Sequence, residues 1–507
     1  MPIKTIKRIL QARVYDVANE TPVEAARFLT KRLKNTVLFK REDLQPVFSF
    51  KVRGAYNKIV NLSQAEQDKG VIAASAGNHA QGVALAAKQL GIKATIVMPT
   101  TTPEIKVSSV AELGGKVVLH GDSFDDAYAH AQKLMVKHGY CFVHPYDDPD
   151  VIAGQGTIGM EILRQVSGPL DAIFIPVGGG GLIAGVSCYI KYLRPDIKII
   201  AVESEDSACF KAAMDAGRRV TLPEVGLFAD GVAVKKIGKE TFRLAKQFVD
   251  EAITVSTDEI CAAIKDVFDD ARCITEPAGA LSVAGLKKYV QQHNVTGQTL
   301  LAITSGANVN FDRLRHIAER SELGEKREAI FAVTIPEKTG SFKTFCKALG
   351  KRSITEFNYR YAGRKEAHVF VGVQTKSSAE VDTLQTKLEG KGYRVVNLSD
   401  NEMAKLHIRH LVGGHGPSAV DSLESESLFR FEFPERPGAL LAFLQTLGSR
   451  WNISLFHYRN HGAAFGRVLV AMQIPPGEEK IVEEYFSDLG YRYWTETENP
   501  AYRLFLQ

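Results

Sequence analysis

The residue best placed to do chemistry near the N-terminus is a lysine in an apolar stretch. Residues 47–56 read VFSFKVRGAY, which places Lys51 between a Ser-Phe pair and a Val-Arg-Gly-Ala run. Its apolar neighbours favour burial, and burying an ammonium group is costly. An apolar site lowers the pKa of a lysine and makes it a usable nucleophile and base. The alternative is a surface lysine whose aliphatic stem alone packs on its neighbours.

Three glycine-rich or polar turns follow apolar runs that read as strands. SAGNHAQG (75–82) and GGGGLIAG (178–185) each open a helix, and TSGAN (304–308) brings hydroxyls and an amide to the end of a third strand. Amides at a helix start bind carboxylate or phosphate. Four consecutive glycines leave a bare backbone that can wrap an anion, whereas tight packing alone is expected to need only one or two of them.

The second turn also fits a dinucleotide-binding fingerprint. Gly179, Gly181 and Ala184 match G-x-G-x-x-G/A, and Glu203 ends the next strand where a ribose-binding acid belongs. A dehydrogenase would leave Lys51 and the Asn78 turn without a role. Pyridoxal phosphate, which has one phosphate and one aldehyde, would use every part, because it needs an anion cradle, a lysine and partners for its ring oxygen and nitrogen.

These turns must be positioned by an α/β domain. Short apolar runs alternate with amphipathic stretches up to about Arg320, which predicts a mostly parallel sheet with ligands at the carboxyl ends of the strands. The predicted strands are 71–75, 94–99, 116–121, 172–178, 198–204 and 300–306. The predicted helices are 79–92, 123–139 and 182–195, the second opened by Asp122 or Ser123 and closed by Gly139. We place this catalytic domain at residues 1–320.

The rest of the chain contains an internal duplication. After the charged segment 315–329, interpreted as a helix end plus linker, residues 331–363 align with 429–462 through nine matches in order and one single-residue shift. Each copy reads strand, turn, helix, strand, turn, strand, an α+β unit of the ferredoxin-like kind. We predict a second domain at 321–507, with modules at about 328–400 and 426–507. The matched pairs are Pro336/Pro434, Gly340/Gly438, Phe345/Phe443, Leu349/Leu447, Gly350/Gly448, Ile354/Ile453, Phe357/Phe456, Tyr359/Tyr458 and Arg360/Arg459.

Composition excludes several classes of protein. The 507 residues are 45% hydrophobic and 24% charged, typical of a globular chain with two to four domains. The net charge of +5 comes without a long basic block, so nucleic acid is a poor candidate partner. Six cysteines without a Cys-x-x-Cys pair indicate neither zinc nor disulfides. With no signal peptide and no run of roughly 18 apolar residues, we expect a soluble, cytoplasmic protein without membrane contact.

Four segments carry a resemblance to a known family. SFKVRGA, SAGNHAQG, GGGGL and SGANVNFDRL, in this order and spacing, resemble the fold-type II pyridoxal-phosphate enzymes. With the duplicated modules, the whole chain resembles the biosynthetic threonine deaminases (threonine ammonia-lyases). The resemblance implies an α/β catalytic domain of two lobes, similar to the tryptophan synthase β subunit, followed by an α+β regulatory domain of two ACT-like modules.

The resemblance also implies roles for residues of this chain. Lys51 would form the Schiff base with pyridoxal phosphate and then take the proton from Cα of L-threonine or L-serine. Asn78 would bond the ring oxygen, and Ser305 would face the ring nitrogen, where a neutral hydroxyl favours β-elimination over transamination. The implied products are 2-oxobutanoate and ammonia, in what would be the first committed step of isoleucine biosynthesis. Further cofactor contacts are expected from Phe50, Gly178, Gly179, Gly180, Gly181 and Leu182, and substrate contacts from Ser75, Ala76, Gly77 and His79.

Two positions bear on the relatives of this family. Serine racemases of this fold resemble the chain but carry a serine at the position of Ala76, where it acts as a second acid–base group. The methyl group here favours elimination over racemisation. Glu203 matches an acidic position of a cation site, but the SEDSAC that follows offers no secure ligand set, so no metal is assigned. A catalytically silent amino-acid sensor is the alternative that is not an enzyme.

The duplicated modules are expected to regulate the enzyme. In the family, this region binds isoleucine, which inhibits, and valine, which opposes it. Two modules of this shape can place strand edges and turns side by side and form a pocket for an α-amino acid. The residues predicted for it are Phe342, Tyr359 and Tyr458, whereas Phe345 and Phe443 lie on predicted helices and are expected to fill cores. We also expect a homo-oligomer, namely a tetramer.

Overall fold

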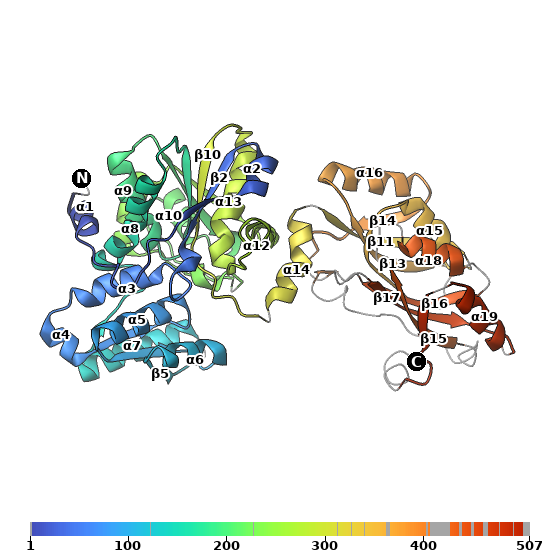
Figure 1. Cartoon of the computed structure of the whole chain (residues 1–507), viewed down its shortest axis with the longest axis horizontal. Coiled ribbons are helices and arrows are strands. Elements are labelled where there is room, and N and C mark those ends of the chain that lie inside the picture. The colour runs from blue at the N-terminus through green and yellow to red at the C-terminus, as the bar shows by residue number, and fades with distance from the viewer. Residues whose placement is uncertain are drawn as a thin grey trace. The chain divides into compact units, whose positions relative to one another are not determined.

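The structure is a computed structural model, which divides into two compact units, residues 1–324 and 325–507 (Figure 1). Among the residues described, no helix has both the length and the apolar character needed to cross a membrane. The described residues are 3–121, 123–226, 228–311, 313–325, 327–338, 340–360, 366–401, 404–405, 426–434, 439–447, 451–459, 465–475, 477–489 and 491–499.

The first unit is built on two sheets. The larger has the strand order β1-β2-β10-β7-β8-β9 and is parallel except for β1, and the smaller has the order β5-β4-β3-β6 and is wholly parallel. The strands are β1 (Val23–Ala25), β2 (Thr36–Arg41), β3 (Val71–Ala74), β4 (Ala94–Met98), β5 (Lys116–Leu119), β6 (Cys141–Phe142), β7 (Ala172–Pro176), β8 (Lys198–Ser204), β9 (Glu251–Val255) and β10 (Thr299–Thr304). Two sheets in one unit confirm the two α/β lobes.

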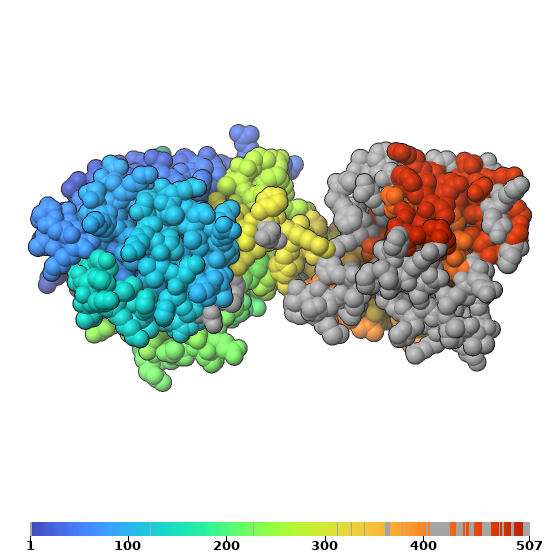
Figure 2. Space-filling model, turned by 90° about the horizontal axis from the view of Figure 1, so that it is seen from below, coloured from blue at the N-terminus to red at the C-terminus, as the bar shows by residue number. Residues whose placement is uncertain are grey.

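Helices flank both sheets (Figure 1). They are α1 (Ile3–Leu10), α2 (Arg27–Leu33), α3 (Lys51–Val60), α4 (Gln64–Lys69), α5 (Asn78–Leu90), α6 (Glu104–Glu112), α7 (Phe124–His138), α8 (Pro149–Gln165), α9 (Gly181–Leu193), α10 (Cys209–Asp215), α11 (Lys239–Phe248), α12 (Thr257–Ala271), α13 (Pro277–His293) and α14 (Arg313–Gly324). Residues near 100–140, in cyan, form much of the surface seen in Figure 2, so α6 and α7 belong to the outer layer of the small lobe.

The predicted elements of this unit are confirmed, and local chemistry explains their ends. Ser123 is the N-cap of α7 and accepts the N–H of Asp126, and Gly139 ends the helix at a φ of 72°. Asp122, the other candidate cap, lies outside the described residues. The charged segment 315–329 contains the end of α14 at Gly324 and the start of the next strand at Glu328.

Helix α3 links the two lobes, because it packs on both α5 and α8. Its Arg53 side chain is fully buried and bonds Glu42 at 2.8 Å and Glu161 at 2.5 Å, while Lys40 bonds Glu161 at 2.6 Å. Two cations thus face two carboxylates in the interior. Burial alone would raise the pKa of Glu42, but the Arg53 charge and its hydrogen bonds hold that pKa below the usual range. The cluster fixes the helix that begins at Lys51.

The second unit carries one eight-stranded sheet with the order β14-β11-β13-β12-β16-β17-β15-β18. The first module is β11 (Glu328–Pro336), α15 (Ser341–Leu349), β12 (Ile354–Arg360), β13 (Glu366–Gln374), α16 (Ser378–Glu389) and β14 (Arg394–Asn397). The second is β15 (Glu426–Pro434), α18 (Ala439–Leu447), β16 (Asn452–Arg459), β17 (Phe465–Gln473), α19 (Glu479–Leu489) and β18 (Arg492–Thr495). Each copy is a ferredoxin-like βαββαβ unit, as the duplication predicts.

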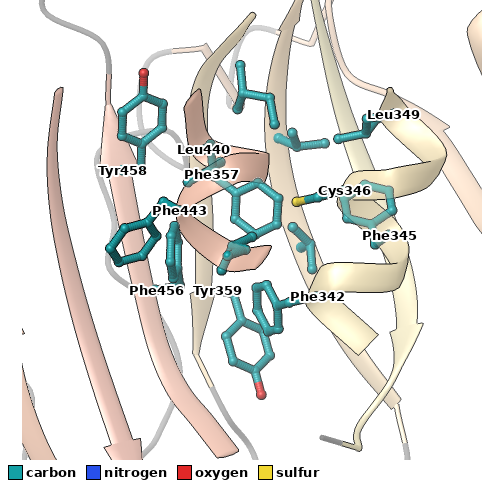
Figure 3. Close-up of a cluster of buried hydrophobic side chains, with 14 of the residues drawn as sticks. Phe342, Phe345, Cys346, Leu349, Phe357, Tyr359, Leu440, Phe443, Phe456 and Tyr458 are labelled. Atoms are coloured by element: carbon teal, nitrogen blue, oxygen red, sulfur yellow. The ribbon is translucent and has the colours of Figure 1, made fainter. Parts of the chain in front are cut away.

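The two modules are joined through equivalent strands. β12 and β16 pair antiparallel, with Phe357 opposite Tyr458 and Tyr359 opposite Phe456, so the pairing repeats itself about a local two-fold axis. Aromatic rings from both copies meet in the core at this seam (Figure 3). Phe345 and Phe443 are fully buried there, which confirms that they fill the core. Gly438 and Gly448 of the matched pairs lie outside the described residues.

Candidate active site

Lys51 is the first residue of α3, and its side chain is hydrogen-bonded within the protein. Its Nζ donates to the carbonyl oxygen of Pro145 at 3.1 Å and lies 5.4 Å from the ring centroid of Phe50. Burial lowers the pKa of the amine from 10.5 to about 8, although the nearby carboxylate of Glu276 acts in the opposite direction. A lysine with this pKa offers far more free amine near neutral pH than a surface lysine does. The hydrogen bond and the lowered pKa argue against the alternative of a surface lysine.

The glycine loop follows β7 and presents bare amides. Gly179 O accepts the Thr241 hydroxyl at 2.8 Å and the Gly238 N–H at 3.2 Å, and Gly178 O accepts the Cys209 thiol at 3.5 Å. The N–H groups of residues 178–182 donate to no acceptor in the described part of the chain. Carbonyls that are already hydrogen-bonded and amides that are free could together hold an anion such as a phosphate at the start of α9.

Packing also demands glycine throughout this loop. A Cβ at Gly179 would lie 2.1 Å from the Tyr146 ring, and Gly180 has a φ of 90°. A Cβ at Gly178 or Gly181 would meet neighbouring backbone at 2.8 or 3.1 Å. The expectation that packing explains only one or two of the four glycines is wrong. The case for an anion therefore rests on the free amides.

The turn between β3 and α5 provides a second set of amides. Within the described residues, the N–H groups of Ala76, Asn78 and His79 have no acceptor, whereas the Gly77 N–H bonds Ser75 Oγ at 3.3 Å. The His79 ring is turned away, because its Nε2 bonds the Val143 carbonyl at 2.8 Å. Burial, aided by the Lys51 charge, lowers the pKa of His79 to about 3, so the ring is neutral. His79 can thus serve a carboxylate only through its backbone.

Asn78 is tied into a chain of hydrogen bonds. Its Nδ2 donates to Glu276 Oε1 at 2.6 Å, and its Oδ1 accepts from Asn308 Nδ2 at 2.7 Å. Glu276 is 4% exposed, and burial, together with the charge of Asp230, raises its pKa to about 7. Sequence reasoning missed Glu276. Its only local signal is the Thr-Glu-Pro that opens α13.

Ser305 follows β10, the neighbour of β7 in the large sheet. Its hydroxyl donates to the Ala278 carbonyl at 3.2 Å, and its own carbonyl accepts the Phe50 N–H at 3.2 Å. To donate to a ring nitrogen, the hydroxyl must rotate away from Ala278, which a serine can do. Phe50 and Leu182 pack into the core cluster of the large sheet.

A short turn after β6 joins Lys51 to the glycine loop and was not singled out from the sequence. Pro145 accepts the lysine, and Tyr146 packs on Gly179. Asp147 accepts the N–H groups of Lys239 and Glu240 at 2.7 and 2.8 Å, capping α11. The signal for this turn is the polar HPYDD (144–148) directly after a strand. It brings the amine and the anion cradle together.

The carboxylate of Glu203 is hydrogen-bonded to backbone N–H groups. Its two carboxylate oxygens accept the N–H groups of Phe210 and Lys211, each at 2.8 Å, so it holds the first turns of α10. This is not the free acid that a ribose would need. Among the described residues, no cluster of three or more His, Cys, Asp or Glu side chains is arranged to hold a metal ion.

The three predicted effector residues lie in the second unit. Phe342 and Tyr359 are in contact, with ring centroids 4.5 Å apart, and the Tyr359 hydroxyl donates to Glu337. Tyr458, 1% exposed, occupies the equivalent position in the second copy. The hydroxyls of the two tyrosines point away from the aromatic cluster at opposite ends (Figure 3).

Comparisons with known proteins cover nearly the whole chain. Residues 14–306 match the family described as pyridoxal-phosphate dependent enzyme, and residues 319–408 and 419–506 match the C-terminal regulatory domain of threonine dehydratase. The L-threonine dehydratase biosynthetic IlvA of Burkholderia multivorans is 56% identical over 504 residues, 99% of each chain.

Two solved structures resemble somewhat less than two thirds of the chain. The processed form of threonine deaminase isoform 2 from Solanum lycopersicum has a TM-score of 0.62 and 50% identity, and the match covers 63% of this chain and 93% of that chain. The serine racemase from Dictyostelium discoideum has a TM-score of 0.56 and 32% identity, covering 61% and 99%. Neither the dehydrogenase nor the silent sensor agrees with these relatives.

Proposed function

The chain belongs to the biosynthetic threonine dehydratases, pyridoxal-phosphate-dependent lyases with a C-terminal regulatory domain, and on that premise we propose that Lys51 is its catalytic lysine. The reaction is dehydration and deamination of L-threonine to 2-oxobutanoate and ammonia, and L-serine is a second substrate. The observation that carries the assignment is the Lys51 amine, of lowered pKa, bonded through Pro145 to the turn that packs on the glycine loop.

The residues present fit the cofactor. The free amides of residues 178–182 match a phosphate, and the Lys51 amine matches an aldehyde. The Asn78 N–H not used by Glu276 is available for a ring oxygen, and the Ser305 hydroxyl for a ring nitrogen. No charged side chain is needed at the phosphate, because the amides and the start of α9 supply the positive potential.

Different residues of the chain have different roles in the reaction. Bound pyridoxal phosphate supplies the electron sink that makes loss of the Cα proton possible. Lys51 would hold the cofactor at its aldehyde, and its freed amine would take the proton from Cα of threonine. The amides of Ala76 and His79 hold the substrate carboxylate. Loss of the β-hydroxyl, followed by hydrolysis, gives 2-oxobutanoate and ammonia.

Ala76 supports elimination over racemisation. It lies at the start of the turn that offers free amides, and its methyl group can neither donate nor accept a proton. Racemisation requires proton exchange on both faces of Cα, and Lys51 serves one of them. Because a serine racemase is 32% identical, racemisation is a competing activity that an experiment should exclude.

The test of the catalytic assignment combines a spectrum with turnover. The purified protein should show an absorbance band near roughly 410 nm that is lost in Lys51→Ala. L-Threonine should yield a 2-oxo acid with wild type and with Lys69→Ala, an exposed lysine of α4. Folded Lys51→Ala that still deaminates threonine at more than a small fraction of the wild-type rate would refute the assignment.

The regulatory site is proposed at a pocket between the two modules. Glu337, Ser341 and Phe342 line it from the first copy, and Leu444 and Trp451 from the second. Glu337 Oε2 and Ser341 Oγ are buried with no hydrogen-bond partner among the described residues. An orphaned carboxylate oxygen suits an ammonium group, and an orphaned hydroxyl at the start of α15 suits a carboxylate.

This arrangement supports a branched α-amino acid as effector. Leu444 and Trp451 provide the apolar wall, and Tyr359 acts by holding the second oxygen of Glu337. Isoleucine, the end product, inhibits from here, and valine opposes it. The matching turn in the second copy, residues 435–438, lies outside the described residues, so Tyr458 stays a prediction.

Inhibition curves of full-length variants test the regulatory proposal. Glu337→Gln and Phe342→Ala should raise the isoleucine concentration for half-inhibition while threonine turnover without isoleucine persists. A coupling of roughly 1–3 kcal/mol, or about 5–150-fold, is the range available to be lost. Glu389→Gln, exposed on α16 of the same module, is the matched control. Unchanged inhibition in both variants would place the effector elsewhere.

The assembly and location belong to the same proposal. We place the enzyme in the cytoplasm as a homotetramer. Light scattering on the purified full-length protein measures the mass directly against the 55.7 kDa of one chain. A monomer at micromolar concentration would contradict the tetramer without affecting the catalytic assignment.

A further inference from the structure

The Asn78 side chain has an orientation that its neighbours determine. Asn308 Nδ2 donates to two groups, the Val47 carbonyl at 2.9 Å and Asn78 Oδ1 at 2.7 Å. Asn78 Nδ2 in turn donates to Glu276 Oε1 at 2.6 Å. The three side chains therefore form a directed chain that runs from Val47 to Glu276.

The acceptors at the two ends of this hydrogen-bond chain determine which way each asparagine amide is turned. A backbone carbonyl and an ionised carboxylate can only accept hydrogen bonds. Asn308 must therefore turn its NH₂ toward Val47, which leaves that group to face Asn78 Oδ1. Asn78 must turn its own NH₂ toward Glu276. Neither amide can flip without placing two acceptors or two donors against each other.

From this we infer that Glu276 is a positioning residue for the cofactor: with Asn308 it locks Asn78 so that the one free N–H of its amide is presented to the ring oxygen of pyridoxal phosphate. This rests on the proposed function, because it assumes that Asn78 meets the cofactor. An unlocked Asn78 could instead present its carbonyl oxygen, which would repel an anionic ring oxygen.

The surroundings of Glu276 keep its carboxylate in place. A Cβ at Gly306 would lie 2.7 Å from Glu276 Oε1, and one at Gly231 would lie 3.5 Å from the same atom. Glycine at these two positions leaves room for the carboxylate beside Asn78. The backbone N–H of Asn308 acts to lower the pKa of Glu276, and the Asn308 side chain bonds Asn78, so Asn308 affects both residues.

Charged groups near Glu276 control whether its carboxylate is ionised, and so whether Asn78 is held in one orientation. Asp230 and burial disfavour its ionised form, whereas Lys106 favours it, and the Lys51 amine interacts with it as well. Protonated Glu276 could donate to Asn78 and permit the flipped amide. The lock is thus complete only while Glu276 is ionised.

Equilibrium binding of pyridoxal phosphate to the full-length apoenzyme tests the inference. Glu276→Gln can donate as well as accept, so it should raise the dissociation constant about five- to tenfold, the loss of roughly one hydrogen bond, and shift the absorbance maximum of the bound cofactor. Glu276→Asp keeps an acceptor-only group and should restore part of the affinity. Glu203→Gln, a buried carboxylate that holds α10 instead, is the matched control and should leave the spectrum unchanged.

A double-mutant cycle separates positioning from a general loss of structure. In an Asn78→Ala background, Glu276→Gln should have no further effect on cofactor affinity, because the group it orients is gone. Additive effects of the two changes, or a wild-type spectrum and affinity for Glu276→Gln, would overturn the inference. Wild-type protein that binds no pyridoxal phosphate at Lys51 would instead overturn the proposed function and the inference with it.

Discussion

Replacing the buried Arg53 with methionine should destabilise the first unit strongly. Its guanidinium makes two bonds of 2.8 Å to Glu42 and bonds of 2.5 and 2.9 Å to Glu161. After the change, Glu161 keeps Lys40 and Tyr15, but Glu42 keeps only the neutral donors Thr21 and Gln45. Two buried carboxylates then share one remaining cation, Lys40, which hydrogen-bonds Glu161.

The expected loss in the free energy of unfolding can be taken from buried ion pairs in other proteins. Removing one partner of such a pair costs about 3–5 kcal/mol, a large part of the roughly 5–15 kcal/mol that stabilise a typical domain. Removing the opposite charge as well should recover much of it, so Arg53→Met/Glu42→Gln should be more stable than Arg53→Met alone. Arg243→Met, which breaks an exposed pair with Glu240, should change stability by no more than about 0.5 kcal/mol.

The stability that the Arg53 cluster contributes depends on pH. The pKa of Glu42 in the folded protein lies below its ordinary 4.5, so the cluster stabilises the fold above about pH 4.5 and loses this contribution as pH falls. Without Arg53, the carboxylates bind protons more readily in the folded state. The deficit of Arg53→Met should therefore be largest near neutral pH and should shrink toward acid.

Urea unfolding followed by circular dichroism measures the change, with tryptophan fluorescence as an internal control. Both tryptophans, Trp451 and Trp494, belong to the second unit and should report a transition that Arg53→Met leaves in place. The reasoning fails if Arg53→Met costs no more than Arg243→Met, or if adding Glu42→Gln to it destabilises the protein further.

Three other predictions concern the active site. Gly179→Ala should weaken binding of pyridoxal phosphate at least about tenfold in an absorbance titration, because its Cβ would lie 2.1 Å from the Tyr146 ring, and Tyr146→Ala should relieve part of the loss; unaltered affinity would contradict the packing argument. Ala76→Ser should raise the D-serine formed from L-serine relative to pyruvate, measured by chiral chromatography, and a ratio equal to that of wild type would argue against the role given to Ala76. The rate at which the apoenzyme takes up pyridoxal phosphate should rise with pH and level off above about pH 8, as the Lys51 amine loses its proton; a stopped-flow midpoint near pH 10 would contradict the lowered pKa.

The sequence alone determined which residues could do chemistry and in what kind of scaffold. Lys51, the Ser75–His79 turn and the glycine loop are each local signals, because side-chain type and position after a strand are visible in a few neighbouring residues. The strands and helices of the first unit follow from apolar periodicity and capping, which are also local. The duplication revealed two equal modules without any knowledge of how they pair.

Only the tertiary structure decided how these parts hold one another. Glu276 meets Asn78 across 198 residues, and Arg53 meets Glu161 across 108, so no local pattern joins them. The same holds for Tyr146 against Gly179, which showed that packing demands a glycine there. The seam between Tyr359 and Phe456 depends on which strand edges pair. Such contacts are set by the order of strands in a sheet and by the burial of charge, which are properties of the folded chain as a whole.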